Sequence, residues 1–124
     1  DRVLKACDIA LGRNPIGHKQ REGDSRTPEG RYILDWRNPD SKYHLAIHIS
    51  YPNDADRKRA RKRGESPGGD IMLHGYPDGA FGSIWSRYWF LGKGWTDGCI
   101  AVSNAEMDQI WKSVRNGTPI DIYP

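Results

Sequence analysis

The sequence predicts a mainly β fold, with short strands, many turns and only small helical elements. Fourteen glycines and eight prolines in 124 residues favour turns and short strands over a helical bundle. The clearest strand is KYHLAIHIS, residues 42–50, where apolar side chains alternate with polar or small ones. No linker or internal repeat divides the chain, so residues 1–124 are expected to form one domain around one core.

Two further strands are expected in the first half of the chain. Alternating apolar residues predict one over residues 3–11, with Cys7 on its apolar side as a small buried residue. A long polar connection rich in turn residues follows over residues 14–30. RYILDW, residues 31–36, predicts the next strand, after which Asn-Pro-Asp at 38–40 turns the chain.

A helix, a short strand and a long loop are expected next. NDADRKRARKRGE, residues 53–65, reads as a short capped helix with a solvated basic surface. Residues 71–74 form a short strand that runs into His74. Residues 76–95 contain seven aromatic side chains and show no clean period, which is typical of a functional loop; an aromatic minicore is the alternative.

The C-terminal part predicts a strand, a helix and a last strand. Residues 100–102 form a very short strand, and Ser103 with Glu106 makes a capping box. An amphipathic helix follows and ends at Gly117. PIDIY, residues 119–123, is the last strand.

Composition narrows the classes of partner. The net charge of +3 suits an anionic partner without identifying one, and the basic helix lacks the aromatic residues of a nucleic-acid surface. No apolar run reaches the length of a membrane span, and the N-terminus is no signal peptide, so an export signal or earlier strand is expected to have been removed. Two cysteines form neither a disulfide framework nor a metal motif, although a Cys7–Cys99 bridge is an alternative. His44 and His48 would lie about 13 Å apart on a strand, which is too far for both to bind one metal ion, and no third ligand is nearby. A metal site is therefore not predicted, and no cofactor is predicted either.

Cys99 and His74 are the candidate reactive pair. A thiol attacks carbonyls as its thiolate, and a neighbouring imidazole can accept its proton. Gly98 would let a substrate approach the backbone closely, and the N–H groups of Gly98 and Cys99 could face an oxyanion. A buried structural cysteine is the competing interpretation.

Four segments, GDSRTPEGRYIL, HISYPN, IMLHG and TDGCIAVSN, occur in the order and approximate spacing of the L,D-transpeptidase catalytic domain. Over about residues 11–123 the sequence therefore resembles this YkuD-like family. The resemblance implies a curled β-sandwich with flanking helices, among them a C-terminal amphipathic one. It also implies that the substrate is the peptidoglycan stem peptide. In such enzymes the cysteine attacks the carbonyl of the third stem residue, commonly diaminopimelate, and expels D-alanine; an amine or water then takes the acyl group.

The resemblance implies roles for individual residues. Cys99 would be the nucleophile and His74 the base, and the Gly75 carbonyl would orient the imidazole. The backbone amides of Gly98 and Cys99, together with Tyr51, would stabilise the oxyanion, and Thr96 would brace the turn. Candidate substrate contacts are Asp97, Trp95, Arg87, Lys93, His48 and Asn104. His48 is alternatively an ordinary strand histidine.

The sequence departs from the family pattern in two places, at Ala101 and in the loop over residues 76–95, which is long for the family. Many relatives carry an arginine where this chain has Ala101, so a carboxylate contact is expected to be lost or moved to Arg87 or Lys93. The resemblance implies a monomer in the bacterial cell envelope and carbapenem β-lactams as inhibitors, whose access the long loop could reduce. A carboxypeptidase that only trims stems and a catalytically silent wall-binding module are the alternatives, and a nucleic-acid binder ranks after them.

Overall fold

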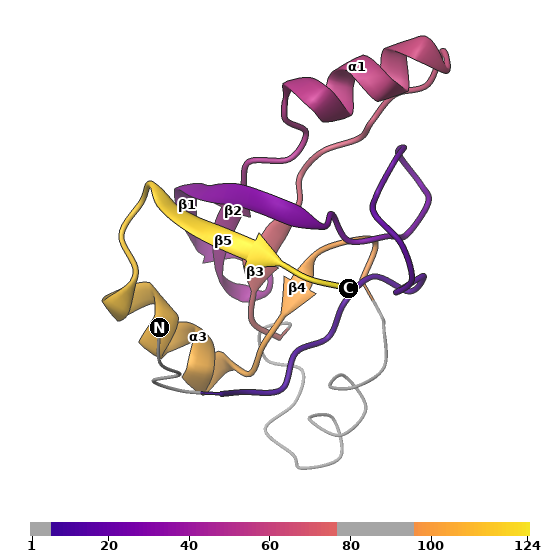
Figure 1. Ribbon diagram of the computed structural model, residues 1–124. Coiled ribbons are helices and arrows are strands. Elements are labelled where there is room, and N and C mark those ends of the chain that lie inside the picture. The colour runs from indigo at the N-terminus through magenta and orange to yellow at the C-terminus, as the bar shows by residue number, and fades with distance from the viewer. Residues whose placement is uncertain (1–5, 77–95) are drawn as a thin grey trace.

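The computed structural model describes residues 6–76 and 96–124, and the strands of this part of the chain form one curled five-stranded sheet (Figure 1). The elements are β1 (Gly30–Ser41), β2 (His44–Ile49), α1 (Asp54–Lys62), β3 (Met72–His74), β4 (Ile100–Ala101), α3 (Asn104–Ser113) and β5 (Thr118–Ile122). The mainly β fold class is confirmed. None of the helices in the described residues is long and apolar enough to cross a membrane.

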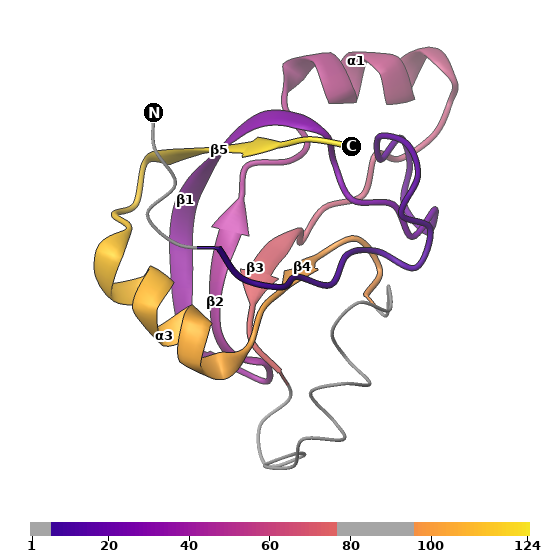
Figure 2. The ribbon, with the colours of Figure 1, turned by 60° about the horizontal axis from the view of Figure 1, so that its bottom comes forward.

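The sheet has the strand order β4-β3-β2-β1-β5, and its last pair at the β4 end is parallel. β2 is antiparallel to both of its neighbours, β1 and β3, and β5 is antiparallel to β1. Beyond β4 the N-terminal segment continues the edge through isolated bridges, from Ala10 to Ala101 and from Gly12 to Thr96. Figure 2 shows this segment running alongside β4.

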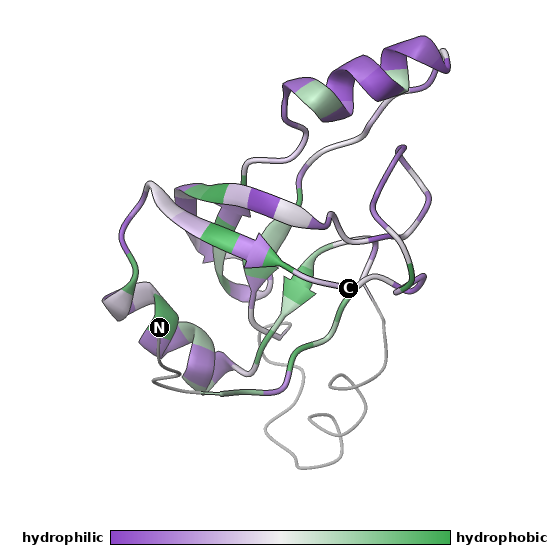
Figure 3. Ribbon diagram, in the orientation of Figure 1, coloured by the Kyte–Doolittle hydropathy of each residue, from purple (hydrophilic) through white to green (hydrophobic). Residues whose placement is uncertain are grey.

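The core lies between one face of the sheet and α3. Ile47, Leu73 and Ile100 face it from three adjacent strands, and Met107 of α3 is completely buried against them. In contrast, α1 is hydrophilic along nearly its whole length and projects from the other side of the molecule (Figure 3). α3 therefore contributes to the core, whereas α1 contributes mainly polar surface.

Strand β1 differs from expectation because it does not end at Trp36. It runs to Ser41, through the Asn-Pro-Asp segment that was predicted to turn. Two register shifts against β2 accommodate this segment, and β5 pairs only with residues 30–34. Pro39 therefore lies where β1 is irregular and has no partner on its other side, which is where a strand tolerates proline.

The prediction of a strand over residues 3–11 is wrong for the described residues 6–11. Among them only Ala10 makes a β-bridge, to Ala101. Cys7 is accordingly exposed rather than buried, and the Cys7–Cys99 disulfide considered above is not formed. Helix α1 is confirmed, with Asn53 and Asp56 forming a reciprocal capping box. α3 ends at Ser113, and Gly117, expected to end it, instead has a φ of 95° in the turn before β5.

Candidate active site

The register of β3 and β4 places Cys99 diagonally across from His74. Leu73 pairs with Ile100 and His74 with Ala101, and Leu73 and Ile100 both face the core. Side chains alternate along strands, so His74 projects from the opposite face, as does Cys99 one residue before Ile100. A strand spacing of about 4.8 Å and a rise of about 3.3 Å per residue put their Cα atoms roughly 8 Å apart. Side chains at this diagonal spacing can approach one another.

The imidazole of His74 is buried and oriented by the main chain. Its Nδ1 lies 2.6 Å from the carbonyl oxygen of Gly75, and its ring stacks on Tyr43 at 4.6 Å. Burial lowers the pKa of His74, and the hydrogen bond to Gly75 offsets part of that effect. A neutral imidazole that donates from Nδ1 carries its lone pair on Nε2, the nitrogen that can accept a proton.

The Gly75 carbonyl is itself held in place from two sides. The Gly75 N–H donates to the Tyr43 carbonyl at 3.0 Å, and the next N–H, that of Tyr76, donates to Asn104 Oδ1 at 2.7 Å. A Cβ on residue 75 would lie 2.3 Å from the same Asn104 oxygen, so any larger residue would displace Asn104 from its hydrogen bond to Tyr76. Asn104, considered above as a substrate contact, is thus placed against the backbone that orients His74.

The thiol of Cys99 is half-buried between two main-chain groups. Its Sγ accepts from the Met72 N–H at 3.3 Å and donates to the Asp70 carbonyl oxygen at 3.4 Å. Burial raises the pKa of Cys99, and the charges of Asp70 and Asp97 add to this; the Met72 N–H and Lys19 act in the opposite direction. The resting group is therefore a protonated thiol near neutral pH.

Thr96 organises the turn that carries Cys99. Its hydroxyl donates to the Cys99 carbonyl at 2.7 Å and accepts from the Gly98 N–H at 3.2 Å. The Gly98 N–H would have to leave Thr96 before it could bind an oxyanion. The Cys99 N–H makes no hydrogen bond to any residue in the described ranges, so it is the better placed of the two donors.

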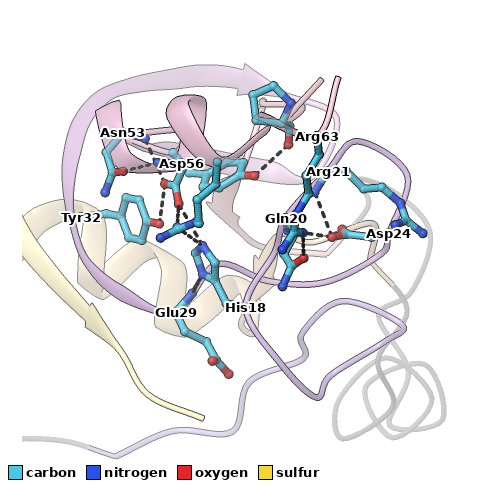
Figure 4. A network of polar contacts seen from close by, with 12 residues as sticks. His18, Gln20, Arg21, Asp24, Glu29, Tyr32, Asn53, Asp56 and Arg63 are labelled. Atoms are coloured by element: carbon cyan, nitrogen blue, oxygen red, sulfur yellow. Dashed lines mark hydrogen bonds and ion pairs between the residues drawn. The ribbon is translucent and has the colours of Figure 1, made fainter. Parts of the chain in front are cut away.

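The loop containing GDSRTPEG is held together by the buried carboxylate of Asp24. The Asp24 carboxylate accepts from the N–H groups of Gln20 and Arg21, as Figure 4 shows, and also from the Arg26 N–H and Lys19 Nζ. Burial alone would raise the pKa of Asp24, but these hydrogen bonds together lower it. Lys19 was missed by sequence reasoning, since a single lysine in a polar connection has no pattern that marks it as buried.

The other predicted site residues have different surroundings. Tyr51 is a core residue whose hydroxyl donates to the Pro67 carbonyl at 2.8 Å. Asp97 is exposed and forms an ion pair with Arg13. Arg87, Lys93 and Trp95, like all of the expected loop except Tyr76, lie outside the described residues.

His48 shares the Cys99 side of the sheet. It pairs with Met72 in the β2–β3 register, its Nδ1 lies 2.6 Å from Asp35 Oδ1, and its ring stacks on Trp36 at 4.6 Å. His44 instead pairs with Asp108 at 2.6 Å. Within residues 6–76 and 96–124, no three His, Cys, Asp or Glu side chains are grouped as a metal site requires.

Ala101, at which an arginine was considered in the sequence analysis, lies in the edge strand β4 of the sheet. It exchanges two main-chain hydrogen bonds of 2.8 Å with Ala10 and is completely buried. Its strand partner on the other side is His74.

Comparison with known families and proteins identifies relatives of this arrangement. The family model described as the YkuD L,D-transpeptidase catalytic domain matches residues 1–122. YafK of Escherichia coli (strain K12), which carries a provisional L,D-transpeptidase name, is 34% identical over 130 residues. That match covers 97% of this chain but 42% of YafK, so the chain spans less than half the length of this relative.

Solved structures give the same fold. The cell-shape-determining protein Pgp2 of Campylobacter jejuni is 32% identical with a TM-score of 0.61, over 89% of this chain and 34% of that one. Bd1075 of Bdellovibrio bacteriovorus is 28% identical with a TM-score of 0.57, over 93% of this chain and 37% of that one. An L,D-transpeptidase of Mycobacterium smegmatis, at 15% identity and a TM-score of 0.58, shares the fold over 98% of this chain and 49% of its own.

Proposed function

The chain belongs to the YkuD family of L,D-transpeptidase catalytic domains, and on this premise we propose that it is a cysteine acyltransferase acting on peptidoglycan stem peptides. The scissile bond is the amide after the third stem residue, of the diaminopimelate type, and D-alanine is the leaving group. The observation that carries the proposal is the parallel register of β3 and β4, which sets Cys99 diagonally across from His74.

The acylation step begins from a neutral pair. Cys99 loses its hydrogen bond to Asp70 and transfers the thiol proton to His74 Nε2, while Nδ1 remains bonded to the Gly75 carbonyl. The sulfur attacks the stem carbonyl, and the amine of D-alanine leaves with the proton that His74 returns. A thioester on Cys99 is the product.

Deacylation reverses these proton movements. An acceptor amine, or water, attacks the thioester and gives its proton to His74, which returns it to the departing thiolate. The developing oxyanion is stabilised by the Cys99 N–H, whose donor is not engaged by another described residue. An amine produces a crosslinked or exchanged stem, and water produces a trimmed one.

The proposed partners follow from the same chemistry. The substrate is a cell-wall stem peptide, the location is the bacterial cell envelope, and carbapenem β-lactams acylate Cys99 because they offer a reactive carbonyl to the same thiol. The basic helix α1 has no part in these steps.

The first prediction concerns turnover of a tetrapeptide stem. We expect Cys99→Ala and His74→Ala each to lower D-alanine release at least about a thousandfold, because nucleophile and base act in one step. Mass spectrometry of products formed with and without a diaminopimelate acceptor separates transfer from hydrolysis: a dimer mass indicates transfer, and a tripeptide alone indicates trimming.

Cys7→Ala is the matched control, since Cys7 is an exposed cysteine outside the site, and it should retain full activity. D-alanine release that survives Cys99→Ala would refute the mechanism. Stem binding without release by the unsubstituted protein would favour the wall-binding module.

A further inference from the structure

A polar cavity of about 390 Å³ is lined by Asp70 and Asp97, which lie close to the candidate nucleophile in space and in sequence. It lies between the N-terminal loop, the segment before β3 and the turn that carries Cys99, and its charged lining residues are Arg13, Lys19, Glu22, Asp70 and Asp97. The carbonyl oxygen of Asp70 is also the group that accepts from the Cys99 thiol at 3.4 Å. A ligand group in the cavity would therefore lie on the Asp70 side of the Cys99 thiol.

Lys19 is the buried cation of this cavity. Its side chain is only 3% exposed, and lysine is rarely buried without a partner for its charge. Nζ donates to Asp24 Oδ1 at 3.0 Å and to the Arg21 carbonyl oxygen at 3.2 Å. An ammonium group has three donors, and the third makes no hydrogen bond to any residue that the structure describes. Lys19 can therefore donate to a carboxylate in the cavity.

The acidic side chains of Glu22 and Asp70 line the same cavity as Lys19. Arg13 and Asp97 pair with each other, but the carboxylates of Glu22 and Asp70 make no hydrogen bond or ion pair with a residue in the described ranges. The cavity thus offers one available cationic donor and two available carboxylates. A group that carries both a carboxylate and an ammonium is complementary to this arrangement.

We propose that this cavity is a subsite for a zwitterionic α-amino-acid centre, in which Lys19 binds the carboxylate and Glu22 and Asp70 bind the ammonium group. The inference rests on the proposed function, because the diaminopimelate side chain ends in such a centre. Three methylene groups separate it from the carbon that bears the scissile carbonyl. A stem with lysine in the third position ends in an ammonium alone and leaves Lys19 without a ligand.

Binding to the Cys99→Ala protein tests the subsite without turnover. Calorimetry would compare tetrapeptide stems that differ only in the third residue: diaminopimelate, diaminopimelate amidated at its side-chain carboxylate, and lysine. We expect the last two to bind about tenfold to a hundredfold more weakly, since each loses a charge-assisted hydrogen bond. Equal Kd values for the three stems in the folded protein would overturn the proposal.

Substitutions in the cavity test which residues distinguish the diaminopimelate stem from the amidated stem. Lys19→Met, added to Cys99→Ala, should weaken binding of the diaminopimelate stem to the level of the amidated stem and remove the preference between them. Lys62→Met is the matched control, because Lys62 is an exposed lysine on α1. A preference that persists in folded Lys19→Met protein would contradict the role of Lys19.

Glu22→Gln provides a second variant in case the loss of Lys19 unfolds the loop around Asp24. It should reduce the preference for a free side-chain ammonium over an N-acetylated one, and an unchanged preference would count against the subsite. In the unsubstituted enzyme, D-alanine release without acceptor reports on the donor stem, and transfer to intact or amidated acceptors reports on the acceptor. Discrimination in either reaction supports the subsite and identifies which stem it serves. Absence of turnover would refute the proposed function but leave the binding comparison valid.

Discussion

Cys99 and His74 are both neutral in the resting site because burial opposes a charge on each of them. Burial raises the pKa of the thiol and lowers the pKa of the imidazole, so both changes oppose a thiolate–imidazolium pair. The thiol proton is directed to the Asp70 carbonyl instead. Proton transfer to His74 is thus expected as part of the attack on a bound substrate.

The pH dependence of turnover follows from these two shifts. The reactive form has neutral His74 and protonated Cys99, so the acid limb of kcat/KM should fall below pH 6.5, the ordinary histidine pKa. The alkaline limb should lie above pH 9.0, the ordinary value for the thiol. Initial rates of D-alanine release across this range would define both limbs.

Alkylation of the thiol tests the same assignment without substrate. In Cys7→Ala protein, the rate of iodoacetamide reaction with Cys99 should still be rising at pH 9.0, because burial raises the thiol pKa above that value. A rate already at its maximum near neutral pH would show that the resting group is a thiolate.

At the scale of elements, the first turn of α1 is tied to the sheet and to the N-terminal loop through Asp56. The buried carboxylate accepts from the Tyr32 hydroxyl at 2.7 Å and the Asn53 N–H at 3.0 Å, and it bonds His18 Nε2 at 2.9 Å (Figure 4). His18 Nδ1 accepts a hydrogen bond from the Glu29 N–H. The ring hydrogen of a neutral His18 is therefore on Nε2, which donates the hydrogen bond to Asp56. α1 is therefore anchored by polar contacts at its first turn, while most of its surface is solvated.

Asp56→Asn should destabilise the protein by about 1–3 kcal/mol, because an amide cannot accept all of these hydrogen bonds. Burial alone would raise the pKa of Asp56, but the bonds from Tyr32, Asn53 and His18 lower it below 3.8. A lowered folded-state pKa adds stability above pH 3.8 that is lost as pH falls through the folded value. Urea unfolding at several pH values should show that the variant lacks this part of the acid sensitivity.

Asp54→Asn is the control for this substitution, because Asp54 lies in the same turn of α1 but is fully exposed. Its effect on the free energy of unfolding should stay within about 0.5 kcal/mol. If both variants lost the same free energy of unfolding, the destabilisation would come from removing a negative charge near the helix N-terminus and not from breaking the buried network around Asp56.

The elements that sequence reasoning predicted well are those set by local chemistry. Alternation identified β2, and the capping residues located α1, because both signals lie within a few neighbouring residues. The extension of β1 past Pro39 could not be predicted, since it depends on which side of the strand lacks a partner. The role of Asn104 was equally hidden, because its partner Tyr76 is 28 residues away.

At the scale of the whole molecule, the nucleophile turn is built where three distant segments meet. A Cβ on Gly98 would lie 2.7 Å from the Arg26 carbonyl oxygen, and one on Gly12 would lie 2.2 Å from the Ser25 carbonyl oxygen and 3.2 Å from Gly98 Cα. The GDSRTPEG loop therefore packs directly on the turn before Cys99. The sequence showed that these motifs occur together, but their contact depends on the folded chain.

Gly98→Ala tests this packing, with Gly117→Ala as its control. Both glycines have positive φ, 131° and 95°, but a Cβ on Gly117 meets nothing within 4 Å. The control should lose only the cost of the backbone conformation, about 1–2 kcal/mol in urea unfolding. Gly98→Ala should lose roughly 1–3 kcal/mol more, since the Arg26 carbonyl is a main-chain group and cannot retreat without shifting its own segment. Equal losses would mean that the turn can move away from the loop, and the position of Cys99 would then not depend on GDSRTPEG.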